Sequence, residues 1–87
     1  MNKLTQQEAS RVLAEALRLE SLCKKSGSRL GQAIHWAYDD VSMLDAEIKC
    51  KLMQLLDSSY ATDDDFYYWT DEVAVTNKFY ELYVEQY

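Results

Sequence analysis

The spacing of apolar residues along the chain predicts helices. From position 9 onward, apolar side chains recur every three or four residues, which places them on one face of an α-helix. Thr5 and Glu8 stand three positions apart just before this pattern, and such a pair forms a capping box at a helix start. We therefore predict a first helix over residues 5–25. Its predicted solvated positions include three charged residues, Arg11, Glu15 and Arg18.

The helical spacing continues from residue 30 to residue 56 without losing phase, which predicts one long second helix over residues 29–57. Ser42 followed by Asp45 also matches a helix-start signal, so a break near Asp40–Ser42 is the alternative. The chain has 2 Gly and no Pro, although an all-β protein would need such residues for its tight turns.

A third helix is predicted over residues 62–86. Thr62 can cap it, and the acids that follow suit the positive end of a helix dipole. With 87 residues there is room for one hydrophobic core. The sequence therefore predicts a single all-α domain over residues 1–87. Its architecture would be a small three-helix bundle, or a four-helix bundle if the second helix breaks.

Negative charge and aromatic residues concentrate in the last third of the chain. Residues 57–87 hold eight acidic side chains against one lysine, a net charge of −7, whereas residues 1–56 have a net charge of +1. Nine of the eleven aromatic residues lie in the same acidic segment. Such a surface repels nucleic acids and anionic membranes and attracts basic proteins. We therefore expect a basic protein partner, with neither direct nucleic-acid binding nor a membrane role.

The cysteines and the first residues favour a cytoplasmic location. Cys23 and Cys50 lack the short spacing of metal-binding pairs, and the chain begins with no apolar leader. No stretch reaches the roughly 18 apolar residues that a bilayer-spanning helix needs. We predict a cytoplasmic protein with reduced, mostly buried thiols, and a Cys23–Cys50 disulfide is the alternative.

The stretch "DDDFYYW" at residues 63–69 joins three carboxylates to four aromatic side chains. In a helix that begins at Thr62, Phe66 and Trp69 would face the core and leave two tyrosines among the acids. Tyrosines at such positions either pack along the edge of a core or form a protein-binding hot spot. The binding hypothesis predicts a partner-binding surface made of Asp63, Asp64, Asp65, Tyr67, Tyr68, Asp71 and Glu72.

A second candidate site lies between the first two predicted helices. Backbone amides at a helix start, together with nearby cations, can bind an anion such as a phosphate or a nucleotide. This segment matches no phosphate-loop motif, and a helix end followed by a helix start also explains it. The residues of this alternative anion-binding site are Lys24, Lys25, Ser26, Gly27, Ser28 and Arg29.

The sequence offers little for catalysis or metal binding. His35 is the single histidine, and its spacing to Asp39 suits a surface pair on one helix face. No nucleophile motif accompanies this pair. Consecutive acids at 63–65 point in different directions and lack the alternating spacing of a calcium loop. We therefore predict no enzymatic activity, no cofactor and no metal site.

Two resemblances extend the functional expectation. The segments "SRLGQAIHW" and "DDDFYYWTDEVAVTNKFYELY" are similar in layout to small uncharacterised bacterial and phage proteins, which implies a small stand-alone protein. "DDDFYY" resembles the acid- and tyrosine-rich binding segment of small helical immunity proteins, which block basic nuclease toxins. The proline and glycine that follow this segment in those proteins are missing here, and the rest of the chain does not match.

These features predict a non-enzymatic, acidic, helical protein that binds a basic protein partner. An inhibitor or accessory factor from a phage or mobile element is one concrete form of this prediction. Anion binding through residues 24–29 is an alternative. A self-associating structural protein is another, because the predicted third helix has two apolar lines that a second copy of the chain could cover.

Overall fold

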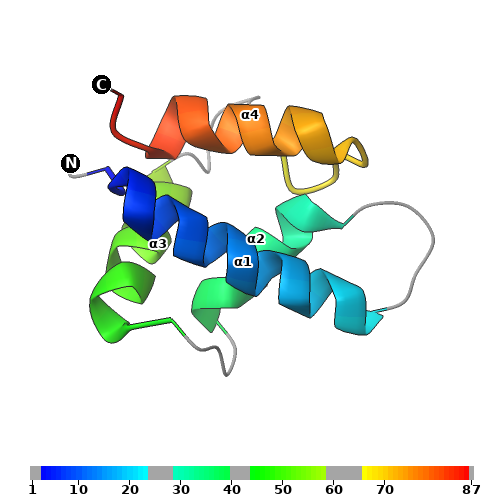
Figure 1. The fold of residues 1–87 in the computed structure, drawn as a ribbon, viewed down its shortest axis with the longest axis horizontal. Coiled ribbons are helices and arrows are strands. Elements are labelled where there is room, and N and C mark those ends of the chain that lie inside the picture. The colour runs from blue at the N-terminus through cyan, green and yellow to red at the C-terminus, as the bar shows by residue number, and fades with distance from the viewer. Residues whose placement is uncertain (1–2, 24–28, 40–43, 59–65, 87) are drawn as a thin grey trace.

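The computed structural model describes residues 3–23, 29–39, 44–58 and 66–86. Within these ranges the chain forms four helices, which are α1 (Gln6–Cys23), α2 (Leu30–Asp39), α3 (Ala46–Ser58) and α4 (Glu72–Tyr83). The predicted all-α class is confirmed. In Figure 1, α1 passes in front of α2, α3 lies at the left, and α4 runs along the top. Helix α2 is central because the most extensive helix–helix contacts, those with α1, α3 and α4, all involve it.

Apolar side chains from all four helices meet in one core. The faces predicted from the helical spacing are the buried ones in α1, α2 and α3. Two extended segments beside the helices also contribute, one before α1 and one after α4. The largest fully buried side chains are Leu4, Val12, Leu30, Ile34, Leu52, Phe66, Val75, Phe79 and Val84.

The predicted capping box at the start of α1 is confirmed. The amide of Thr5 donates to the carboxylate of Glu8 at 3.0 Å, and the amide of Glu8 donates to the Thr5 hydroxyl at 3.1 Å. The Nζ of Lys51 on α3 lies 3.0 Å from the same carboxylate. Glu8 therefore joins the start of α1 to α3 as well as capping its own helix.

Protonation of Glu8 is expected to weaken the fold. The hydrogen bond from the Thr5 amide, assisted by Lys51, lowers the pKa of Glu8 below its ordinary value. A lowered folded-state pKa means that the contribution is present above the unfolded-state pKa and is lost as pH falls. We predict that Glu8→Gln lowers the free energy of unfolding by about 0.5–1 kcal/mol at neutral pH, and by less under acidic conditions.

Urea unfolding of both proteins at neutral and acidic pH measures this difference. Glu47→Gln is the matched control, because Glu47 is an exposed acid in the first turn of α3. A Glu8→Gln effect that is the same at both pH values would contradict the assigned role of the carboxylate.

The predicted continuous helix over residues 29–57 is wrong, and the four-helix alternative is confirmed. Leu44 and Asp45 lie outside any helix, whereas the predicted break point at 40–42 is outside the described residues. A straight helix of the predicted length would extend about 43 Å, but the longest dimension of the molecule is 35 Å. The break therefore brings both halves of the apolar stripe to the same core.

The predicted third helix is shorter than its sequence pattern indicated. Helix α4 begins at Glu72, and its cap is Asp71, whose carboxylate accepts the amides of Val73 and Ala74 at 3.0 and 3.2 Å. The expected start at 62 is wrong, because residues 66–71 are not helical and include a turn at 67–68. Thr62, the predicted cap, lies outside the described residues.

The two ends of the described chain lie side by side, as Figure 1 shows. The amide of Leu4 donates to the carbonyl of Tyr83 at 2.8 Å, and the amide of Glu85 donates to the carbonyl of Leu4 at 2.8 Å. These bonds form an isolated parallel bridge between Leu4 and Val84. Both bridging side chains are buried, so the ends of the domain are part of its core.

Candidate functional site

Phe66 anchors the candidate binding residues to the core. Its side chain is 1% exposed and lies edge-on to Phe79 and Tyr83, with ring centroids 6.4 and 5.9 Å away. The amide of Trp69 donates to the carbonyl of Phe66 at 3.0 Å and closes a turn. The segment 66–71 is therefore held in place at its first residue.

Helix α2 approaches this turn closely at Gly31. A Cβ atom at this position would lie 2.1 Å from the carbonyl oxygen of Phe66, well inside van der Waals contact. The approach is open to glycine because glycine has no side chain. Gly31 thus allows α2 to lie directly against the backbone of the turn.

Tyr67 and Tyr68 extend from this anchor to the surface. The Tyr67 ring is partly buried and lies edge-on to His35 at 4.9 Å and to Tyr68 at 4.8 Å, measured between ring centroids. Tyr68 is 80% exposed. Edge-to-face pairs of this kind contribute about 0.5–1.5 kcal/mol each. The Tyr68 ring therefore lies in solvent and packs edge-on against the Tyr67 ring.

Helix α4 begins directly after this turn, and the residues at its start carry negative charge. Asp71 and Glu72 are both exposed, and Val73 is 68% exposed. Val73 was not among the predicted site residues, because its position in the chain suggested part of an apolar helix face. With α4 starting at Glu72, the buried face instead comprises Val75, Phe79 and Tyr83. We name the following residues the tyrosine surface: Tyr67, Tyr68, Asp71, Glu72 and Val73.

Three of the predicted partner-binding acids, Asp63, Asp64 and Asp65, lie outside the described residues. The other four predicted members of that surface are described, and they cluster within six residues of the chain. Their arrangement differs from the prediction because they occupy a turn and a helix start, and the prediction placed them along one helix.

The alternative anion-binding segment is described only at Arg29, since Lys24, Lys25, Ser26, Gly27 and Ser28 lie outside the described residues. The backbone amide of Arg29 donates to the carboxylate of Glu20 at 2.9 Å. Its Nη1 donates to the side-chain oxygen of Gln32 at 2.9 Å. The Arg29 amide beside the start of α2 therefore already has an anionic acceptor, which comes from α1.

His35 and Cys50 have surroundings that the sequence did not indicate. The His35 ring lies edge-on to Phe66 and Tyr67, while the side chain of Asp39, its predicted partner, is outside the described part. Cys50 is a free, exposed thiol, so the alternative of a disulfide and the predicted burial of this thiol are both wrong. Among the described residues, no group of three or more metal-binding side chains comes together.

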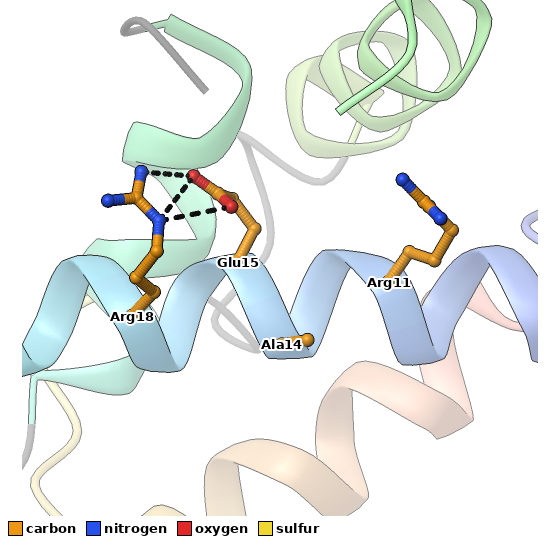
Figure 2. A pocket seen from close by; sticks show the side chains of 4 residues that line it. All are labelled: Arg11, Ala14, Glu15 and Arg18. Carbon is orange, nitrogen blue, oxygen red and sulfur yellow. Dashed lines mark hydrogen bonds and ion pairs between the residues drawn. The ribbon is translucent and has the colours of Figure 1, made fainter. Parts of the chain in front are cut away.

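A shallow groove of about 330 Å³ lies along α1, lined by Arg11, Ala14, Glu15 and Arg18. Figure 2 shows Arg11, Glu15 and Arg18 projecting from the same side of the helix, with Arg18 bent toward Glu15. The Nη2 of Arg18 lies 2.5 Å from Oε1 of Glu15, and its Nε lies 3.2 and 3.3 Å from the two carboxylate oxygens. These hydrogen bonds raise the pKa of Arg18.

Glu15 is only 6% exposed, so its predicted solvated position is wrong. It stands three residues after Val12 and four before Leu19, both buried, so the helical repeat places it beside the apolar face. The paired guanidinium group of Arg18 allows the carboxylate to be buried there.

Comparisons with known proteins do not assign this chain to a family. No family model matches the chain, and neither the curated proteins nor the solved structures contain a significant match. Within the described ranges, no helix is both long enough and apolar enough to cross a membrane. The tyrosine surface and the groove on α1 are therefore the features of the molecule that bear on its function.

Proposed function

We propose that this protein binds a basic protein partner through the tyrosine surface and catalyses no reaction. The observation that carries the proposal is the position of Tyr68, which is 80% exposed and packs edge-on against Tyr67. Tyr67 in turn packs against His35. A large exposed ring that is already held in place loses little conformational entropy when a partner covers it.

The charge near this surface supports a basic partner. Asp71 and Glu72 are exposed beside the turn, and residues 57–87 carry a net charge of −7. Acidic side chains at the rim of an interface accelerate the approach of a basic protein and disfavour acidic ones. A protein of this kind would act as an inhibitor or accessory factor by covering part of its partner's surface.

Tyr68→Ala is expected to weaken partner binding at least about tenfold, which corresponds to roughly 1.4 kcal/mol of binding free energy. The substitution removes the exposed Tyr68 ring and leaves in place Tyr67 and His35, the two rings that pack behind it. Affinity capture from a native-host lysate, followed by mass spectrometry, would first identify the basic protein retained by the wild type. Calorimetric titration of that protein against both forms then measures the change.

Leu22→Ala is the matched control, because Leu22 is an exposed apolar residue on α1, 64% accessible and away from the turn. We expect this variant to bind as the wild type does. Full retention of the partner by Tyr68→Ala, together with its loss in Leu22→Ala, would place the binding surface on α1 and overturn the proposal.

Self-association is the second candidate function, and exposed apolar side chains favour it. Such side chains occur on three helices and on the turn, namely Leu17, Leu22, Met53, Tyr68 and Val73. A second copy of the chain could cover the tyrosine surface in a symmetric dimer. Sedimentation at two protein concentrations separates the two candidates, because only self-association gives a mass that rises with concentration and falls in Tyr68→Ala.

A further inference from the structure

The Tyr68 ring presents at least one open face to solvent. It packs against the Tyr67 ring at an interplanar angle of 78°, with the ring centroids 4.8 Å apart. In such a pair, one ring directs its edge at the face of the other. If Tyr68 supplies the edge, both of its faces are open, and if it supplies the face, the opposite face is open. The 80% exposure of the side chain agrees with either arrangement.

The acidic residues that follow this ring have acceptors to spare. Asp71 accepts the amides of Val73 and Ala74 through Oδ1 alone, so its Oδ2 takes no part in the helix cap. Glu72 is exposed and makes no hydrogen bond or ion pair within the described ranges. Three residues separate Asp71 from Tyr68 in the chain, so their Cα atoms are at most about 11 Å apart. This separation is comparable to the Debye length of about 8 Å at physiological ionic strength, so Asp71 favours positive charge above the ring.

Charge decides among the groups that could cover the ring. Exposed aromatic rings at binding sites stack with nucleobases, apolar side chains or cations. A nucleotide carries phosphate, which the net charge of −7 in residues 57–87 repels. An apolar side chain would cover the ring but would gain nothing from the carboxylates. A cation gains from the carboxylates and also from the ring, because the face of an aromatic ring carries the negative part of its quadrupole.

We propose that the partner places an arginine side chain over the open face of Tyr68. This inference rests on the partner binding proposed above and specifies the chemistry of the contact. A guanidinium group is planar and weakly hydrated, so it stacks on a ring and keeps the donors along its edge for a carboxylate. The ammonium group of lysine is compact and strongly hydrated, which makes it the poorer partner for a ring. Val73, which is 68% exposed, offers apolar surface to the methylene groups of an arginine.

Titration with octa-arginine and octa-lysine peptides tests the proposal, because the two peptides carry the same charge and present different cationic groups. Calorimetry at one fixed ionic strength gives the dissociation constants, and NMR follows the ring signals of Tyr68. We expect octa-arginine to shift these signals and to bind the wild type more tightly than octa-lysine does. This preference for arginine should be about threefold larger in the wild type than in Tyr68→Leu, which keeps apolar bulk and removes the ring.

Two further variants separate the ring from charge and from aromatic content. Glu72→Gln should weaken the binding of both peptides by a similar factor, because it removes a charge and leaves the ring in place. Tyr80→Leu is the matched control, since Tyr80 is a partly buried tyrosine of α4 outside the tyrosine surface. It should leave the preference for arginine unchanged.

A preference for arginine that persists in Tyr68→Leu, or that Tyr80→Leu reduces equally, would overturn the proposal. Equal binding of the two peptides to the wild type would overturn it as well. These outcomes are distinct from a failure of the proposed function. A captured partner that binds Tyr68→Ala as tightly as the wild type contradicts the tyrosine surface itself, whereas equal peptide binding contradicts only the arginine contact.

Discussion

The Gly31→Ala protein is expected to lose about 2–3 kcal/mol of unfolding free energy, although alanine is ordinarily the better helix former. The added Cβ would lie 2.1 Å from the carbonyl oxygen of Phe66 and 3.0 Å from the carbonyl carbon. Backbone atoms cannot rotate away as the tip of a side chain can, so α2 or the turn must shift. Urea unfolding measures the stability loss, and the NMR signals of Tyr67 and Tyr68 report the displaced turn.

The sign of the change makes this test decisive. At a helical position without a close neighbour, replacing glycine by alanine stabilises a protein by about 0.4–1 kcal/mol. A stabilised Gly31→Ala protein would therefore contradict the close approach of α2 to the turn. Ser10→Ala, at an exposed position of α1, is a suitable control and should change the stability by no more than about 0.5 kcal/mol.

The parts of this fold that follow from local rules were predictable. The capping box at Thr5 and Glu8 involves residues three positions apart, and it forms as predicted. The apolar spacing likewise identified the buried faces of α1, α2 and α3, because burial of one helix face follows directly from the helical repeat.

The helix boundaries were harder to predict because more than one stretch of the sequence matches the pattern of a helix start. Both Thr62 and Asp71 are capping residues followed by acids, and nothing in their immediate neighbourhood ranks one above the other. Burial of Phe66 against α2 and α4 is compatible with a turn at 66–71, and this tertiary contact is absent from any local pattern. The break before α3 has the same origin, since the apolar phase continues across it.

The same distinction applies to the candidate sites: features set by local rules were predictable, and features set by tertiary contacts were not. Tyr67 and Tyr68 could be recognised from sequence because consecutive aromatic residues cannot all face one core. Val73 is absent from the predicted site because a helix over 62–86 would place it well inside an apolar face, whereas α4 begins one residue before it, at Glu72. The groove on α1 was missed because the burial of Glu15 depends on the bent conformation of Arg18, and residue spacing carries no information on side-chain conformation.

Loss of the Phe66 ring is expected to have the largest effect on both stability and function. Removal of a buried phenylalanine ring costs about 3–5 kcal/mol, whereas a domain of 87 residues has a total stability of roughly 4–13 kcal/mol. The Phe66→Ala protein should therefore lose a large part of its stability and unfold at a much lower temperature than the wild type. Circular dichroism during thermal unfolding measures this loss.

Phe66 both fills the core and anchors the turn at 66–71, and Phe66→Leu separates these two roles. It keeps an apolar side chain in the core and costs only about 1–1.5 kcal/mol of unfolding free energy. Phe79→Leu is the matched control, since Phe79 is equally buried but lies in α4 and not in the turn. Both variants should lose similar stability. Phe66→Leu should alter the ring signals of Tyr67 and Tyr68 and weaken partner binding more than Phe79→Leu does, because Phe66 directly precedes Tyr67 in the turn and anchors it in the core. Equal effects of both variants on those signals would mean that the surface depends on overall packing, and Phe66 would then not be its anchor.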